Sequence, residues 1–184
     1  MAETVDDEYL VKQFNQGDNS AFDRIVGQYS ADVAVLVNRL LGWPGDVEDV
    51  TQDVFLSAFL GLKKFRCECS LRTWLFTIAI NKCRSHRYKR MLRLRVFSRR
   101  EDELSYARLY DEGKTPMDKE VFERVRHAVR ALPLRCREPV VLRYLHELPT
   151  DEICRILGLS NNALHVRLHR ARQLLKRHLA ELME

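Results

Sequence analysis

The sequence predicts an all-α protein of two small helical domains joined by a linker. Apolar residues recur every three or four positions along most of the 184-residue chain, which is the spacing of amphipathic helices. Glycine and proline are scarce, at 7 and 5 residues, and this favours helices over strands. Between 92 and 118 the helical period is lost. The predicted domains are therefore 1–91 and 119–184, with a linker at 92–118.

Four helices are predicted in the first domain. Gly17-Asp18 ends the first and Gly42-Trp43-Pro44-Gly45 ends the second, because glycine and proline interrupt a helical backbone. Residues 65–70 follow the third helix and are predicted to form a loop. These pieces are enough for a compact helical bundle. The expected bounds are Asp7–Gln16, Ala21–Leu41, Asp46–Lys63 and Ser70–Arg90.

The third predicted helix separates acidic from apolar side chains. Leu56 and Leu60 fall among or beside the acidic positions, and carboxylates next to apolar groups suit a basic helix of another protein. Two simpler explanations stay open: acids favour any helix start, and the leucines could face another helix of the bundle. The acidic face holds Glu48, Asp49, Gln52 and Asp53, and the apolar stripe holds Val47, Val50, Val54 and Ala58.

The fourth predicted helix combines an apolar stripe with a polar, basic surface. The polar face suits phosphates and unstacked bases, while a solvated basic helix would show the same pattern. Hydroxyl, amide, cationic and aromatic groups recur on this face at Thr73, Thr77, Asn81, Arg84 and Tyr88. Cations flank it at Arg72, Lys82, Arg87, Lys89 and Arg90, and the inward positions are Leu71, Trp74, Leu75, Ile78 and Ala79.

The second domain is predicted to end in a helix-turn-helix. A helix from Lys119 is stopped by Pro133, and another runs from Arg137 to Glu147. A short helix then begins at Thr150, which we expect to be its N-cap. Gly158 ends this helix, and Ser160 is expected to cap the last one. Ile153, Ile156 and Leu157 form the apolar face of the short helix.

The last helix has one apolar and one polar, cationic face, which together with the preceding turn predicts insertion into a DNA groove. Taken alone, the helix could equally be amphipathic with a solvated basic face. The apolar stripe comprises Leu164, Leu168, Ala171, Leu175, Leu179 and Leu182. The opposite face comprises Asn162, His165, Val166, His169, Gln173 and Lys176, flanked by Arg170 and Arg172.

Charge is distributed unevenly along the chain. The formal net charge is only +5, yet residues 82–100 contain nine lysines or arginines and no acid, while residues 1–60 carry an acidic excess. This asymmetry predicts a polyanionic partner at one surface and a basic protein at another. No nucleophile–base set, phosphate-binding loop or paired carboxylate cleft is visible, so we expect no enzyme activity.

The five cysteines, without a signal peptide or a spanning apolar run, predict a cytoplasmic protein with no membrane contact of its own. Cys67, Cys69, Cys83 and His86 could be written as a zinc set, but their spacing fits no structural zinc pattern well. We therefore expect no metal and no cofactor. Redox sensing by Cys67 and Cys69 remains an alternative role.

Three segments, in order, resemble bacterial RNA polymerase sigma factors of the extracytoplasmic-function (ECF, sigma-70 family group 4) type. They are DVEDVTQDVFLSAF, KKFRCECSLRTWLFTIAINKCRSHRYK and ALPLRCREPVVLRYLHELPTDEICRILGLSNNALHVRLHRARQLL. The resemblance implies a sigma2 domain and a sigma4 domain, which direct promoter-specific transcription initiation. It implies core RNA polymerase as a partner, through the β′ clamp helices and the β flap, together with promoter DNA and an anti-sigma factor. The alternative function is a stand-alone helix-turn-helix regulator.

The resemblance also implies sites. Trp74 and Asn81 match the family motif; Trp74 falls on the apolar stripe and is expected to be structural, and Asn81 to contact DNA. Core polymerase binding is expected at Asp49, Gln52, Asp53 and Leu56. Contacts to the −10 element are expected at Phe65, Arg66, Glu68, Ser70, Thr73, Thr77, Asn81, Arg84, Arg87 and Tyr88. Contacts to the −35 element are expected at Asn161, Asn162, His165, Val166, Arg167, His169 and Arg170.

Two runs depart from the family pattern. The loop reads Cys67-Glu68-Cys69-Ser70 where the family often has glycine, an acid and serine. The −35 helix reads Ala163-Leu164-His165-Val166 where a Thr-Val-Lys-Ser-like run is usual. The promoter sequence therefore cannot be carried over. We expect Val166 to contact a thymine methyl group and His165 to act as a hydrogen-bond donor or acceptor.

Overall fold

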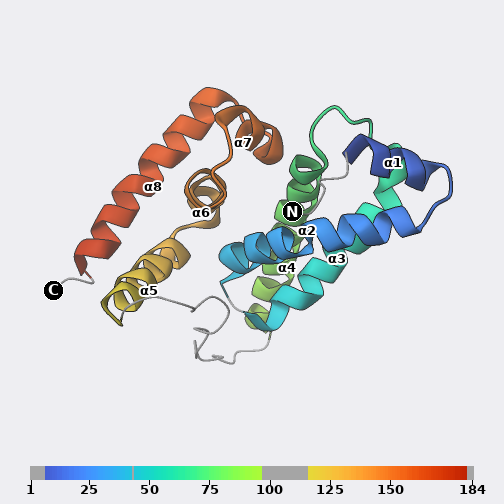
Figure 1. Ribbon diagram of the computed structural model, residues 1–184. Helices are drawn as coiled ribbons and strands as arrows, with labels where there is room; N and C mark the ends of the chain where they lie inside the picture. The colour runs from blue at the N-terminus through green and yellow to red at the C-terminus, as the bar shows by residue number, and fades with distance from the viewer. Residues whose placement is uncertain (1–6, 43, 97–115, 182–184) are drawn as a thin grey trace. The chain divides into compact units, whose positions relative to one another are not determined.

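A computed structural model describes residues 7–42, 44–96 and 116–181 of the protein (Figure 1). Every regular element in these ranges is helical, so the predicted all-α class is confirmed. The chain divides into two compact units, 1–92 and 93–184, which are described separately below.

The first unit is a bundle in which α2 packs against both α1 and α3 (Figure 1). Its helices are α1 (Asp7–Asn15), α2 (Ser20–Leu41), α3 (Val47–Gly61) and α4 (Leu71–Val96), with 3₁₀ turns η1 (Pro44–Asp46) and η2 (Leu62–Lys64). Apolar side chains of these helices form its core, and the fully buried ones include Leu10, Ile25, Leu36, Leu40, Leu62, Leu71, Leu75, Phe76 and Ile80. Of the inward positions predicted for the fourth helix, Leu71, Leu75 and Ala79 are buried, whereas Trp74 and Ile78 are half-buried.

Glycines end the first two helices as the sequence indicates. Gly17 has φ 100° after α1, and Gly42 has φ 81° after α2. The Gly42 N–H donates to the carbonyl oxygen of Asn38 and closes the last turn of α2. Since a side chain strains this left-handed conformation, glycine is the favoured residue at both ends.

The second unit comprises α5 (Pro116–Ala131), α6 (Leu134–Val140), the π-helical turn η3 (Val141–Leu145), α7 (Thr150–Leu157) and α8 (Asn161–Glu181). Helix α8 packs against α5, α6 and α7. The side chain of Arg137 is buried, and its guanidinium donates to the carbonyl oxygens of Arg130 and Leu132 at the end of α5. Carbonyl oxygens that the helix end leaves unpaired thus accept hydrogen bonds from one nitrogen of this buried cation.

Several expected boundaries differ from the structure. Helix α4 continues past Arg90 to Val96, because residues 91–96 contain good helix formers and no breaker. Helix α5 begins at Pro116 rather than Lys119, so both ends of the expected linker are helical, and residues 97–115 lie outside the described part of the chain. The helix expected at Arg137–Glu147 begins earlier, at Leu134, and becomes π-helical at Val141–Leu145. Thr150 is not the N-cap of α7: Pro149 occupies that position and Thr150 begins the helix.

Candidate nucleic-acid and protein interfaces

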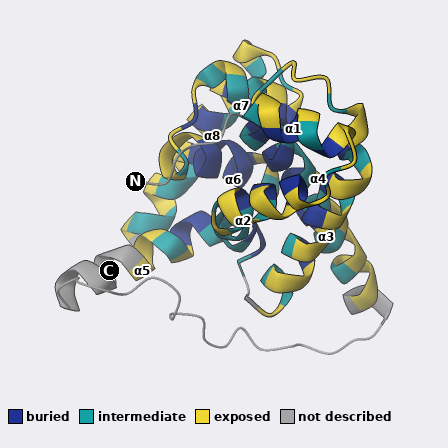
Figure 2. Ribbon diagram, turned by 45° about the vertical axis from the view of Figure 1, so that its right-hand side comes forward, coloured by how far each residue is buried: buried dark blue, intermediate teal, exposed yellow. Residues whose placement is uncertain are grey.

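Helix α3 exposes its acidic residues and buries the opposite side. Glu48, Asp49, Gln52 and Asp53 are all exposed. Val50, Val54 and Ala58 are buried, and Val47 is half-buried. Figure 2 shows both buried and exposed residues along this helix. The separation of faces expected from the sequence is therefore present.

Leu56 and Leu60 do not face another helix of their unit. Leu56 is 58% exposed and Leu60 is 71% exposed, so the bundle-core explanation of these leucines is wrong. Phe59, which the sequence did not single out, joins them at 40% exposure. Its ring is held by edge contacts to Phe14 and Phe22, with centroids 5.3 and 5.1 Å away. Together, Leu56, Phe59 and Leu60 form an apolar ridge beside the carboxylates.

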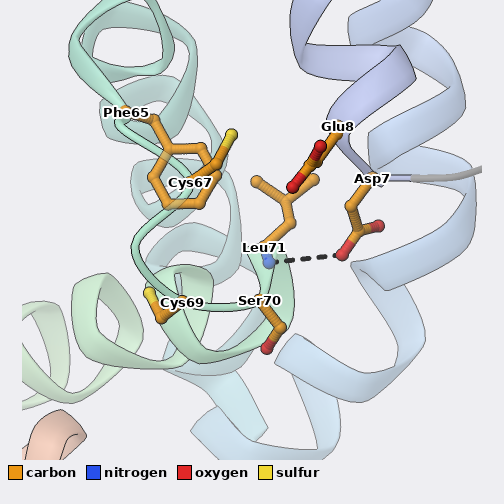
Figure 3. Close-up of a pocket in the computed structure, with 7 residues that line it drawn as sticks. All are labelled: Asp7, Glu8, Phe65, Cys67, Cys69, Ser70 and Leu71. Carbon is orange, nitrogen blue, oxygen red and sulfur yellow. Dashed lines mark hydrogen bonds between the residues drawn. The ribbon is translucent and has the colours of Figure 1, made fainter.

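Residues 65–70 form one wall of a pocket of about 250 Å³ (Figure 3). The ring of Phe65 lies against Trp74, with centroids 4.9 Å apart and planes tilted by 35°. Trp74 is half-buried. Cys67 has φ 55°, a backbone conformation that favours glycine. The pocket is lined by Asp7, Glu8, Phe65, Cys67, Cys69, Ser70 and Leu71.

The outer side of the same loop is charged and open to solvent. Arg66 and Glu68 are exposed, with 4.0 Å between guanidinium nitrogen and carboxylate oxygen. A pair this exposed contributes little to stability, because solvent screens it. Both side chains are therefore accessible from solvent.

The start of α4 is held by side chains from two parts of the chain. The Thr73 N–H donates to the Ser70 hydroxyl oxygen over 3.1 Å, an N-cap contact. The Leu71 N–H donates to the Asp7 carboxylate over 3.2 Å, across 64 positions of sequence. The Tyr29 hydroxyl donates to the other Asp7 oxygen over 2.6 Å. Burial and this carboxylate raise the pKa of Tyr29 above its ordinary value.

The polar face of α4 divides into a structural and an open part. Thr73 is only 2% exposed and its hydroxyl lies 2.8 Å from that of Ser70, so its expected place on the strand-contacting surface is wrong. The reason is its position in the first turn, which packs inside the bundle. Thr77 is half-buried and donates to the Thr73 carbonyl oxygen. Asn81 and Tyr88 are exposed, whereas Arg84 and Arg87 are half-buried.

Three flanking cations of α4 contact groups inside the unit. Arg87 donates to the carbonyl oxygen of Leu40 over 3.4 Å. Arg72 lies 3.0 Å from Asp32 and over the ring of Phe76. Arg90 lies 3.4 Å from Asp46 at the start of α3. These arginines hold α4 against its neighbours. The expected basic surface is consequently narrower than the sequence alone indicates.

The second unit has the expected helix-turn-helix. Gly158 ends α7 with φ 66°, and the Ser160 hydroxyl oxygen accepts the Ala163 N–H over 3.3 Å, so both expected features of this turn are confirmed. Leu164, Leu168 and Ala171 of α8 are buried. Leu175 and Leu179 are half-buried, and Leu182 lies outside the described residues.

The opposite face of α8 is open. Val166 is 50% exposed, and only Arg167 among the expected −35 residues is half-buried. His169 lies 3.0 Å from Gln173 one turn later. The exposed members are Asn161, Asn162, His165, Val166, His169 and Arg170. Amides, imidazoles and cations thus share one surface, which is the chemistry that reads bases and phosphates.

The cysteine–histidine set is not assembled into a site. Cys83 is buried in the core, and His86 lies 3.8 Å from Asp46. In the part of the chain that the structure covers, no three His, Cys, Asp or Glu residues gather closely enough to hold a metal ion. Among the described helices, none has the length and apolar character needed to cross a membrane.

Comparisons with known proteins assign both units. The family models for sigma-70 region 2 and sigma-70 region 4 match residues 25–93 and 122–175. The ECF RNA polymerase sigma-E factor of Haemophilus influenzae is 30% identical over the full length of both chains. The solved structure of CnrH, in complex with the cytosolic domain of CnrY, is 29% identical with a TM-score of 0.68 and covers 95% of this chain and 97% of its own.

A second solved structure shares the fold. The sigma factor RpoE of Bartonella quintana, in complex with the anti-sigma factor NepR, has a TM-score of 0.73 at 21% identity, over 86% of this chain and 96% of its own. The agreement of both units with sigma-70 regions excludes a stand-alone helix-turn-helix regulator. The chain belongs to the ECF RNA polymerase sigma factors.

Proposed function

We propose that this sigma factor binds core RNA polymerase through α3, reads the duplex −35 element with α8, and captures the unpaired −10 strand with residues 65–70 and α4. The observation that carries the proposal is the open face of α3. An apolar ridge left in solvent beside carboxylates fits a partner with apolar and basic side chains. We assign the β′ clamp helices to this face, with Asp49, Gln52, Asp53 and Leu56 as contacts.

Charge reversal on α3 tests the docking assignment. Asp49→Lys should abolish copurification with core polymerase, because Asp49 is exposed and its loss leaves the bundle core unchanged. Asp23→Lys is the matched control, since Asp23 is also exposed but lies on α2. Circular dichroism should show the same helix content for both variants. Normal copurification of the Asp49 variant would refute the assignment.

We propose that α8 lies in the major groove of the −35 element. Arg167 and Arg170 would contact phosphates, Val166 a thymine methyl group, and His165 a base edge. His165→Ala and Val166→Ala should each relax the sequence preference at one base pair. Arg170→Ala should instead weaken binding to all −35 sequences alike and lower the salt dependence of that binding. A library of −35 variants separates these outcomes. Unchanged preference at every base pair in the His165 and Val166 variants would contradict the assignment.

The −10 element is proposed to be bound as single strand. Asn81 and Tyr88 offer an amide and a ring in solvent, and Arg84 and Arg87 supply charge nearby. Phe65, Arg66, Glu68, Ser70 and Thr77 complete the proposed surface, and Thr73 is retained only as a structural residue. Polymerase supplies the chemistry, while strand capture offsets the free energy cost of unstacking.

We also propose control by an anti-sigma factor that covers the docking face of α3. The likeness to the sigma factor RpoE, which was solved with the anti-sigma factor NepR, supports this proposal. Met91 and Leu92 on α4 are exposed and add apolar surface for such a partner. The β flap of polymerase would contact the second unit. We place these events in the cytoplasm, where polymerase and promoter DNA meet.

A further inference from the structure

The pocket beside residues 65–70 has a second wall that comes from α1. Asp7 and Glu8 line it, 57 or more positions before the loop. In Figure 3 these two carboxylates lie across the pocket from Phe65 and Cys69. Nothing in the sequence linked α1 to strand capture, because the two segments meet only in the folded bundle.

The carboxylates of Asp7 and Glu8 have different roles. Asp7 accepts hydrogen bonds from the Leu71 N–H and the Tyr29 hydroxyl, one on each oxygen. It therefore holds the loop end and the start of α4 in place. Glu8 is an exposed residue and its side chain lines the pocket. A carboxylate offers about four acceptor sites, so Glu8 can take a donor from a ligand in addition to contacts within the protein.

The resemblance to ECF sigma factors implies that residues 65–70 hold a flipped −10 base, and the lining fits a base better than a phosphate. Among the described residues around the pocket, two are acids and none is lysine, arginine or histidine. A phosphate would be repelled there by like charge. The remaining lining is made of an aromatic ring, two thiols, a hydroxyl and a leucine side chain, which suit a flat, largely apolar ring. The volume of about 250 Å³ is small for a pocket that takes a drug-sized ligand.

We propose that Glu8 selects the base that enters this pocket, and this inference rests on the proposed capture of the −10 strand. A carboxylate can only accept hydrogen bonds, so it pairs with the exocyclic amino group of adenine, cytosine or guanine. Thymine carries no amino group and presents carbonyl oxygens on either side of its single N–H. The pocket therefore prefers an amino-bearing base to thymine, by roughly tenfold for one charge-assisted hydrogen bond.

The test uses holoenzyme assembled from core polymerase and the full chain. Run-off transcription is measured on promoters that carry each of the four bases at each −10 position. The wild-type chain should disfavour thymine by roughly tenfold at one position. Glu8→Gln should lose this preference there, because an amide can also donate to a thymine carbonyl. Asp23→Asn removes an exposed carboxylate that does not line the pocket, and it should keep the wild-type preference.

Asp7→Ala distinguishes a residue that positions the loop from a residue that selects the base. It should lower transcription from all −10 variants by a similar factor, since it loosens the loop rather than changing the base contact, and Asp7→Asn should restore part of the loss. A Glu8→Gln chain with the full wild-type preference at every position would overturn the assignment of Glu8 and leave the sigma function intact. Absence of selective transcription with the wild-type chain would overturn the proposed function, and this inference with it.

Discussion

Cys67 and Glu147 are the non-glycine residues that hold the left-handed backbone conformation in the described part of the chain, with φ 55° and 54°. In this conformation the Cβ atom crowds the following carbonyl oxygen, at a cost of roughly 1–2 kcal/mol. Cys67 lies in the loop that lines the pocket, so its strain is placed at a proposed functional surface. Glu147 lies in the turn before α7 and lines no such surface.

Replacement of Glu147 by glycine should therefore stabilise the second unit. Glycine removes the Cβ crowding but gains freedom in the unfolded chain, which leaves a net increase of about 0.5–1 kcal/mol in the free energy of unfolding. Glu147→Ala keeps the Cβ atom and is the matched control. Urea unfolding of the full chain measures both variants. A glycine variant no more stable than the alanine variant would show that the turn is not strained.

Helix α3 and the turn after it place neighbouring leucines in opposite environments. Leu60 is 71% exposed, whereas Leu62 in η2 is 0% exposed. Leu60 can be substituted without a change in the core, whereas Leu62 is part of the core. The docking proposal depends on this contrast, because it assigns the exposed leucine to a partner.

Substitution of each of these two leucines by aspartate tests the contrast between them. Leu60→Asp should leave the thermal unfolding midpoint nearly unchanged and weaken core polymerase binding. Leu62→Asp should cost more than about 3 kcal/mol of stability, because it buries an unpaired charge. Calorimetry and copurification measure the two effects. Loss of stability in the Leu60 variant would mean that the ridge packs within the chain.

Sequence periodicity predicted the helices well. It failed where contacts between helices determine whether a side chain is buried. Leu164, Leu168 and Ala171 are buried as their spacing indicates, since a helix face is a local property. Thr73 looked like a surface residue because its polar partners recur every three or four positions. Its burial depends on how the first turn of α4 packs. The Asp7–Leu71 hydrogen bond spans 64 positions and has no local signal.

Burial of Tyr29 and its contact with Asp7 make the bundle sensitive to alkaline pH. The folded state raises the pKa of Tyr29 and holds its proton more tightly than the unfolded chain, where the pKa is about 10. Its contribution to stability is therefore complete below pH 10 and is lost as the pH rises further. The difference in unfolding free energy between the wild type and Tyr29→Phe should be constant from about pH 7 to 9 and shrink above about 10. A constant difference to about pH 11 would contradict the raised pKa of Tyr29.

On the scale of the whole molecule, different surfaces carry different chemistry. The first unit presents an acidic, apolar face on α3 and an amide, a ring and cations along α4. The second unit presents amides, imidazoles and arginines on α8. A net charge of only +5 conceals this division. These surfaces fit the proposed contacts with a protein and with two states of DNA.

Run-off transcription from a library of promoters, with core polymerase in the presence and absence of the chain, is the decisive test of the proposed function. We expect the chain to add transcripts from a defined subset of promoters, and we expect Asp49→Lys to remove them while Asp23→Lys does not. If wild-type chain that binds core polymerase adds no promoter selectivity, the proposed function is wrong.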